Sequence, residues 1–225
     1  MQETSSFNPS VQEGSILIMT AVEAEREAVL RGLNGSPRFD VQLAGVGPAS
    51  AAALTAGRLA AGGYLAVISA GIGGGFAGVA PVESVVVATS IIAADLGAET
   101  AEGFSSVDEL GFGSSRLPVD AGTAARWVQL LAAGGLQACV GPVLTVSTVT
   151  GTAAAAAALA ERVPGAAAEA MEGYGVAMAA RYAGLPAFEL RAISNAVGPR
   201  NRAEWRIKEA LQSLEAAFKI LTEVL

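Results

Sequence analysis

The chain alternates between two patterns of hydrophobic and polar positions. Short runs rich in Val, Ile and Leu are typical of buried strands, and longer Ala-rich stretches with helical spacing are typical of helices. The runs that predict strands are residues 15–20, 39–44, 65–70, 83–92, 141–146 and 187–193. The stretches that predict helices are residues 21–33, 49–61, 121–133, 152–162, 171–182 and 203–225. Because strands and helices alternate, we expect one α/β domain over residues 15–225, with a largely parallel sheet covered by helices on both faces.

Two segments fall outside this alternation. Residues 93–116 are rich in Gly, Ser and acidic residues, which predicts a long loop. A loop of that length inside a compact domain tends to be a functional lid or an oligomer contact. Residues 1–14 lack the charged and apolar regions of a signal peptide, and we expect them to form a disordered leader.

The composition excludes several classes of function. The 225 residues are 52% hydrophobic and 16% charged with a net charge of −7, which argues against nucleic-acid and anionic-membrane partners because both need a basic surface. No apolar run is long enough to span a bilayer. The single cysteine, Cys139, excludes an intramolecular disulfide and fits a reducing cytoplasm. Histidine is absent, so acid–base chemistry falls to carboxylates, amides or water, and a His-ligated metal site is excluded.

Polar residues stand at positions where open α/β sheets bind ligands, beside the carboxyl ends of strands. Glu25 follows the first predicted strand, Glu172 begins the helix before the last strand, and Ser194 and Asn195 end that strand. Such groups are costly in apolar surroundings without partners, so we expect them to face one pocket. Two local alternatives stay open. Glu25 could simply favour a helix N-terminus, and Asn195 could bond neighbouring backbone.

Glycines follow two of the predicted strands, at residues 45–47 and 71–75, which suggests backbone that closely approaches a ligand. The second cluster resembles a dinucleotide fingerprint. No acidic residue ends a following strand at the expected distance, however, and this disfavours a nicotinamide cofactor. We expect neither a cofactor nor a metal.

Six segments carry a resemblance to a known family: residues 20–26 (TAVEAER), 44–52 (AGVGPASAA), 69–76 (SAGIGGGF), 93–113, 169–177 (EAMEGYGVA) and 189–205 (ELRAISNAVGPRNRAEW). The chain resembles the nucleoside phosphorylase/nucleosidase superfamily near the methylthioadenosine/S-adenosylhomocysteine nucleosidases. It resembles more closely the futalosine hydrolases of menaquinone biosynthesis, because of residues 93–113 and the Val-Gly-Pro-Arg of residues 197–200. The resemblance implies a three-layer α/β/α fold with a central, mostly parallel mixed sheet.

The resemblance also implies roles for single residues. Glu25 would activate the attacking water, and Glu172 would hold the ribose hydroxyls with Met171 packed against the sugar. The other residues implied to contact substrate through the main chain are Thr150, Gly151 and Thr152 at the purine and Gly71 and Gly73 near the anomeric carbon.

Asn195 departs from the adenine-specific relatives, which carry an aspartate at this position. An asparagine cannot act as a strong acid, but its NH₂ group donates hydrogen bonds. A 6-oxopurine presents two acceptors, N7 and O6, on the edge where adenine presents N7 and an amine. We therefore expect hypoxanthine as the leaving group.

The nucleophile is expected to be water rather than phosphate. A phosphorylase needs arginines or a serine to hold phosphate, and the glycine segment 71–75 offers neither. Glu25 would repel phosphate. Arg26, taken as the only nearby cation, is expected to point elsewhere on its helix.

Futalosine carries a benzoate beyond its 5′ carbon, and the candidates for its counter-charge are Arg200 and Arg202. Trp205 or Phe104 is expected to lie against the benzoate ring. The alternative is that the two arginines form a solvated cluster at the start of the last helix.

Three further expectations concern assembly and competing functions. Because superfamily members complete their sites with a neighbour's residues, we expect a homo-oligomer, a dimer or higher, with residues 93–113 as the donor. The alternative within the same class is an adenine nucleosidase acting on methylthioadenosine, against which Asn195 weighs. The alternative from another class is a non-catalytic nucleoside-binding protein.

Overall fold

The structure is a computed structural model that describes residues 14–225. The expected leader, residues 1–14, lies outside the described residues apart from Gly14. The strands are β1 (Ser15–Thr20), β2 (Phe39–Leu43), β3 (Tyr64–Gly75), β4 (Val85–Ala93), β5 (Gly97–Thr100), β6 (Gly103–Ser106), β7 (Arg116–Pro118), β8 (Ala138–Thr145), β9 (Ala168–Ala170) and β10 (Ala187–Ala196). The helices are α1 (Glu23–Leu33), α2 (Pro48–Leu59), α3 (Ala121–Ala133), α4 (Ala153–Arg162), α5 (Gly173–Tyr182) and α6 (Ile207–Leu221), with a short 3₁₀ turn, η1, at Arg202–Glu204.

The main sheet is mixed and mostly parallel, as predicted. The order β10-β4-β8-β9-β3-β1-β2 includes parallel pairs between β1 and each of β2 and β3, and between β8 and each of β4 and β9. β10 pairs with β3 as well as with β4, so β3, β10, β4, β8 and β9 form a closed circuit. The long strand β3 therefore connects the open part of the sheet to this closed part.

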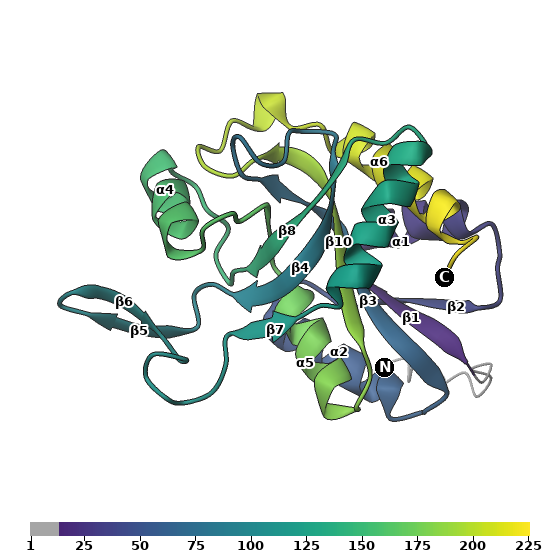
Figure 1. The fold of residues 1–225 in the computed structure, drawn as a ribbon, viewed down its shortest axis with the longest axis horizontal. Helices are drawn as coiled ribbons and strands as arrows, with labels where there is room; N and C mark the ends of the chain where they lie inside the picture. Colours follow the sequence, from purple (N-terminus) through teal and green to yellow (C-terminus); the bar gives the residue numbers. More distant parts are fainter. Residues whose placement is uncertain (1–13) are drawn as a thin grey trace, which may run out of the picture.

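Helices cover both faces of the sheet (Figure 1). On one side lie α1, α3 and α6, and on the other α2 and α5 pack together. β1 divides its side chains between the two layers because alternate residues of a strand point to opposite faces. Ile16 and Ile18 join the core under α1 and α6, whereas Leu17 and Met19 join the core under α2 and α5. This explains why the first strand reads as a continuous apolar run.

Three expectations about local structure were wrong. The glycines after residue 70 continue β3 as a strand instead of forming a loop, because β10 pairs with them as far as Gly75. Residues 93–116 contain a hairpin, β5–β6, and the edge strand β7. The last helix begins at Ile207, not at residue 203, and the short strand β9 was not foreseen. In each case strand pairing or a turn overrides the local pattern.

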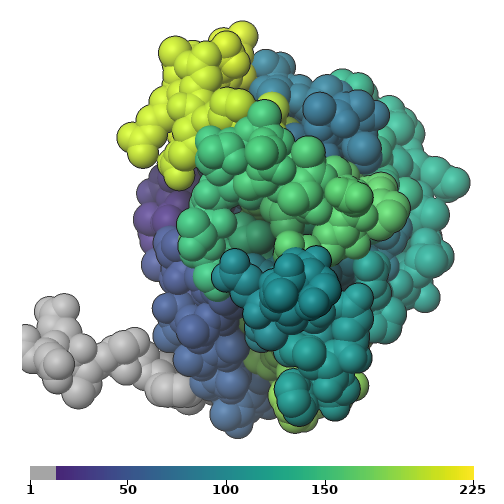
Figure 2. All heavy atoms as spheres, turned by 90° about the vertical axis from the view of Figure 1, so that its left-hand side faces the viewer, coloured from purple at the N-terminus to yellow at the C-terminus, as the bar shows by residue number. Residues whose placement is uncertain are grey.

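The β5–β6 hairpin projects from the body of the molecule beside α4 (Figure 1). Figure 2 views this side, where α4 and the hairpin stand forward with a hollow between them. A hollow of about 610 Å³ beside α4 has Phe104 of the hairpin and Arg162 of α4 in its wall. No helix within residues 14–225 is both long and apolar enough to cross a membrane.

Candidate active site

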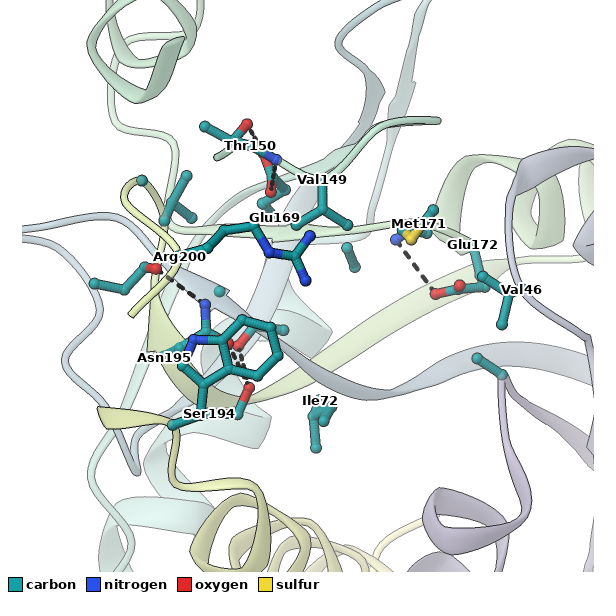
Figure 3. Close-up of a pocket in the computed structure, with 18 of the residues that line it drawn as sticks. Val46, Ile72, Val149, Thr150, Glu169, Met171, Glu172, Ser194, Asn195 and Arg200 are labelled. Carbon is teal, nitrogen blue, oxygen red and sulfur yellow. Dashed lines mark hydrogen bonds between the residues drawn. The ribbon is translucent and has the colours of Figure 1, made fainter. Parts of the chain in front are cut away.

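A cavity of about 260 Å³ lies where β3, β9 and β10 end and where the chain leaves β1 and β8 (Figure 3). Its wall contains most of the residues that the sequence singled out. These are Glu25, Gly73, Thr150, Met171, Glu172, Ser194, Asn195, Arg200 and Trp205. The residues that sequence reasoning did not single out are chiefly Val46, Ile72, Val149, Glu169 and Val197.

Glu25 is fixed by the first turn of α1 and by β3. Its Oε2 accepts hydrogen bonds from the main-chain N–H groups of Ala21 (2.9 Å) and Val22 (3.2 Å), and its Oε1 accepts one from Ile72 (2.8 Å). The local alternative, a carboxylate at a helix N-terminus, is therefore realised, and the same side chain also lines the cavity. The side chain is buried, and this burial raises the pKa of Glu25 although Arg191 and the bond from Ile72 oppose the shift.

Arg191 is a cation close to Glu25, so the prediction that Arg26 is the only nearby cation was wrong. The Arg191 guanidinium, 1% exposed, donates to Glu189 Oε1 (2.9 Å) and to Ser69 Oγ (2.8 Å). Its Nη1 lies 3.4 Å from Glu172 Oε2. Arg26 does point elsewhere, as expected, donating to Glu23 and to the Val41 carbonyl.

A signal for this cluster exists in the sequence. Glu189 and Arg191 stand two residues apart in an otherwise apolar strand, so they share one face of the sheet. Charged residues are almost never fully buried unless they are paired. An i, i+2 pair of opposite charges inside a buried strand therefore predicts an internal ion pair.

Because Gly71 has no side chain, the side chains of Glu25 and Arg191 can occupy the space beside it. A Cβ added to Gly71 would stand 2.5 Å from Glu25 Oε1 and 2.7 Å from Arg191 Nη1. Gly71 thus lies under the cavity, whereas Gly73 belongs to its wall. A Cβ on Gly73 would stand 2.8 Å from the Glu169 carbonyl oxygen, so this glycine permits the close approach of β9.

Glu172 stands at the N-terminus of α5, with Met171 before it. Its Oε1 accepts from the Gly47 main-chain N–H and its Oε2 from that of Met171, both at 3.3 Å. In Figure 3, Met171, Glu172 and Val46 gather at one end of the cavity, away from Asn195. One end of the cavity thus carries Glu25 and Glu172, with Arg191 beside both carboxylates.

The other end is formed by the turn after β8 and by the end of β10. Thr150 lies on the wall and donates to Glu169 through its main-chain N–H (3.0 Å, to Oε1) and through its hydroxyl. Gly151 and Thr152, the other two residues expected at the purine, are not on the wall. Gly151 packs beside Arg200, and Thr152 caps α4 by accepting from the Ala155 N–H.

Asn195 has local hydrogen-bond partners, so the alternative that it bonds neighbouring backbone is realised. Its Oδ1 accepts from Ser194 Oγ (2.8 Å), and its Nδ2 donates to the Ala196 carbonyl (2.9 Å). An amide nitrogen carries two hydrogens. The second hydrogen of Asn195 Nδ2 is therefore available to a ligand in the cavity.

Comparison with known proteins shows which family the chain is similar to. The model of the phosphorylase superfamily matches residues 20–225. A futalosine hydrolase of Streptomyces coelicolor is 53% identical over 93% of this chain and 96% of its own length. One of Acidothermus cellulolyticus is 45% identical over 91% of this chain and 89% of its own. The chain belongs to the futalosine hydrolase family. The structure of futalosine hydrolase from Helicobacter pylori shares the fold, with a TM-score of 0.82 at 16% identity, covering 95% of this chain and 99% of that one.

The resemblance found in the sequence is thus confirmed, and the two family-specific segments can be placed. Residues 197–200 border the cavity, with the Arg200 side chain extending into it (Figure 3). Arg200 and Arg202 both lie over the Trp205 ring, at 5.3 Å and 5.9 Å from its centroid. Arg202 is not on the wall. Within residues 14–225 neither arginine forms an ion pair.

The other family-specific segment does not reach the cavity of its own chain. Phe104 lies under Arg162, 3.7 Å from the guanidinium carbon to the ring centroid, in the separate hollow beside α4. Of the two aromatic candidates, only Trp205 lines the site within residues 14–225. Among the described residues, no group of three acidic or cysteine side chains is arranged to hold a metal ion.

Proposed function

We propose that this chain hydrolyses the N-ribosyl bond of futalosine with water as nucleophile, releasing hypoxanthine and dehypoxanthine futalosine, as a step of menaquinone biosynthesis. The observation that carries the proposal is the charge at one end of the cavity. Three carboxylates, Glu25, Glu172 and Glu189, surround the single guanidinium of Arg191. The excess negative charge favours the positive charge that builds at the anomeric carbon as the bond breaks.

Each group has a place in the reaction. Glu25 takes a proton from water as the water oxygen bonds to C1′. The C1′–N9 bond breaks, and its electron pair leaves with the base, which takes a proton from solvent. Glu172 accepts hydrogen bonds from the ribose hydroxyls and orients the ring, with Met171 against the sugar. Asn195 donates to the 6-oxopurine as negative charge spreads over it, and Ser194 holds the Asn195 amide oxygen.

The same cluster disfavours phosphate as nucleophile. Arg191 is the cation beside Glu25, but Glu189 and Glu172 already pair with it. A phosphate beside Glu25 and Glu172 would meet two carboxylates at close range, and like charges at such distances repel strongly in a buried site. Water fits the site without this cost.

Arg200 is proposed as the partner of the substrate carboxylate. Its guanidinium extends into the cavity, is free of ion pairs within residues 14–225, and lies over Trp205. An arginine and an aromatic ring side by side suit a benzoate group, since the guanidinium pairs with the carboxylate and the indole contacts the ring. In this proposal Arg202 contributes to substrate binding indirectly, through its contact with the Trp205 ring.

We also propose that residues 15–225 act as one nucleosidase domain within a cytoplasmic homo-oligomer. The projecting β5–β6 hairpin and the loop after it, where Phe112 is 82% exposed, support a contact with a second copy. The contributions of Thr150, Gly151 and Thr152 to purine binding belong to the same proposal, with Thr150 as the one on the wall.

The proposal is tested by following base release from futalosine, inosine and methylthioadenosine, each with and without phosphate. We expect hypoxanthine from futalosine at a rate that phosphate does not change. Adenine release from methylthioadenosine as the fastest reaction would contradict the assignment of Asn195, and a requirement for phosphate would contradict that of Glu25.

A further inference from the structure

One buried carboxylate on the cavity wall, Glu169, has no part in the hydrolytic step. It lies in β9, is 5% exposed, and forms no ion pair with any cation within residues 14–225. Burial raises the pKa of Glu169, and the hydrogen bonds from Thr150 only partly oppose that shift. A carboxylate held inside without a cation is expensive. Its position therefore calls for a ligand.

The carboxylate is held rigidly by its surroundings. β9 pairs with β3 on one side, where Glu169 faces Gly74, and with β8 on the other, where it faces Leu144. Thr150 donates to both carboxylate oxygens, one bond from its N–H and one from its hydroxyl. An ionised carboxyl group accepts about four hydrogen bonds and donates none. Glu169 thus keeps unused acceptor capacity in the wall of the cavity.

Glu169 stands at the end of the cavity where the base is proposed to bind. Figure 3 shows Thr150 and Glu169 on one side of this end and Ser194 and Asn195 on the other, with Met171 and Glu172 farther away. Asn195 presents a donor, and Glu169 presents only acceptors. The two walls therefore offer complementary hydrogen-bonding groups, a donor on one side and acceptors on the other.

We propose that Glu169 accepts a hydrogen bond from the N1–H group of the 6-oxopurine and so determines base specificity together with Asn195. This inference rests on the proposed function. With Asn195 donating to N7 and O6, the next group along the ring is N1. Hypoxanthine carries a hydrogen there, whereas adenine presents a lone pair that faces the Glu169 carboxylate unfavourably. A site built around a hydrogen bond rejects an analogue that lacks the hydrogen far more strongly than a hydrophobic site does.

The decisive variant is Glu169→Gln. The Thr150 N–H holds the amide oxygen in place, so the NH₂ group replaces the second carboxylate oxygen and an acceptor becomes a donor. The matched control is Asp95→Asn, which also replaces a carboxylate with an amide. Asp95 lies close enough to Glu169 to help raise the pKa of Glu169. Asp95 accepts from the Ser147 N–H (2.6 Å) and is not on the cavity wall.

Selectivity is measured as kcat/KM for futalosine divided by kcat/KM for its 6-amino counterpart, which differs only at the base. We expect Glu169→Gln to lower this ratio by about 10²-fold or more, while Asp95→Asn leaves it within a factor of about three of the wild-type value. An unchanged ratio in Glu169→Gln, or equal losses in both variants, would overturn the inference.

Calorimetric binding of free hypoxanthine and adenine separates this inference from the proposed function, because binding needs no turnover. We expect Glu169→Gln to lower the affinity for hypoxanthine at least tenfold, and to leave the affinity for adenine unchanged or higher. If the wild-type chain does not cleave futalosine, the proposed function fails, and the two affinities still decide the role of Glu169. Should Glu169→Gln not fold, Thr150→Val removes the hydroxyl that positions Glu169. A fall in the preference for hypoxanthine is expected, with Asp95→Asn again as the control, and no fall overturns the inference.

Discussion

The guanidinium of Arg191 lies 3.4 Å from the carboxylate of Glu172, and both groups are almost inaccessible to solvent. This contact connects Glu172, which is proposed to bind the ribose, with β10, the strand that carries Glu189 and Arg191. Arg191 in turn lies close enough to Glu25 to affect the pKa of Glu25. The site therefore behaves as one electrostatic unit. Changing any member alters the protonation and position of the others.

Replacing Glu25 with Gln is expected to lower kcat by about 10²–10⁴-fold, which is the usual contribution of a general base. KM for futalosine should change little, because Glu25 is proposed to contact the attacking water rather than the ribose or the base. Steady-state kinetics of hypoxanthine release separate the two constants. A KM effect without loss of kcat would mean that Glu25 only binds substrate.

Arg191 is expected to set the pH dependence of the reaction. Glu25 must be ionised to accept a proton, so kcat/KM falls as pH drops through the pKa of Glu25, which burial places above the ordinary value of 4.5. Arg191 opposes that shift. Arg191→Gln should therefore raise the pKa further and move the acid limb of the profile to higher pH.

Arg26→Gln is the control for this prediction, because Arg26 adjoins Glu25 in sequence but pairs with Glu23. We expect its profile to match that of the wild-type chain. Arg191→Gln should also reduce the free energy of unfolding by about 3–5 kcal/mol, since it leaves Glu189 buried without its partner. Chemical denaturation measures this loss, and an unchanged acid limb in a folded Arg191→Gln variant would contradict the account.

Gly71→Ala is expected to reduce kcat severely, because the new Cβ would stand 2.5 Å from Glu25 Oε1 and must displace it. Misplacement of a reacting group by about 1 Å can cost about 10²-fold in rate. Gly57→Ala in α2 is the matched control, since a Cβ there meets nothing within 4 Å. It should keep full activity and gain up to about 1 kcal/mol of stability from improved helix propensity. Comparable activity of the two variants would contradict the proposed geometry.

Arg200→Ala is expected to raise KM for futalosine about tenfold or more, because a charge-assisted hydrogen bond is worth about 1.5–3 kcal/mol. Inosine lacks the carboxylate, so its kinetics should stay close to those of the wild-type chain. Arg202→Ala should have a smaller effect because Arg202 is not on the cavity wall. Equal losses for futalosine and inosine would show that Arg200 supports the site in general.

Much of the fold and part of the site could be predicted from the sequence. The span of α3 is reproduced to the residue, because a clear period and flanking Asp120 and Gly134 mark its ends. β1 is equally clear as a short apolar run. Glu25 could be placed at the cavity because α1 begins directly after that strand. Local patterns were sufficient for these elements.

Other features depend on contacts between distant segments. The glycines of β3 resemble a loop until β10 is known to pair with them. The surroundings of Arg191 comprise Ser69, Glu172 and Glu189, which come from three elements. Glu169 resembles a surface residue in sequence, yet β3 and β8 enclose its short strand. No local pattern contains this information.

The most direct test of the central claim is the pH profile of hypoxanthine release from futalosine in phosphate-free buffer, measured for the wild-type chain and for Glu25→Gln. The account predicts full wild-type activity without phosphate and an acid limb above pH 4.5, the ordinary pKa of a glutamate. For Glu25→Gln the account predicts a rate about 10²–10⁴-fold lower and a pH profile without the acid limb. Wild-type activity that requires phosphate, or a Glu25→Gln variant that keeps both its rate and its acid limb, would contradict it.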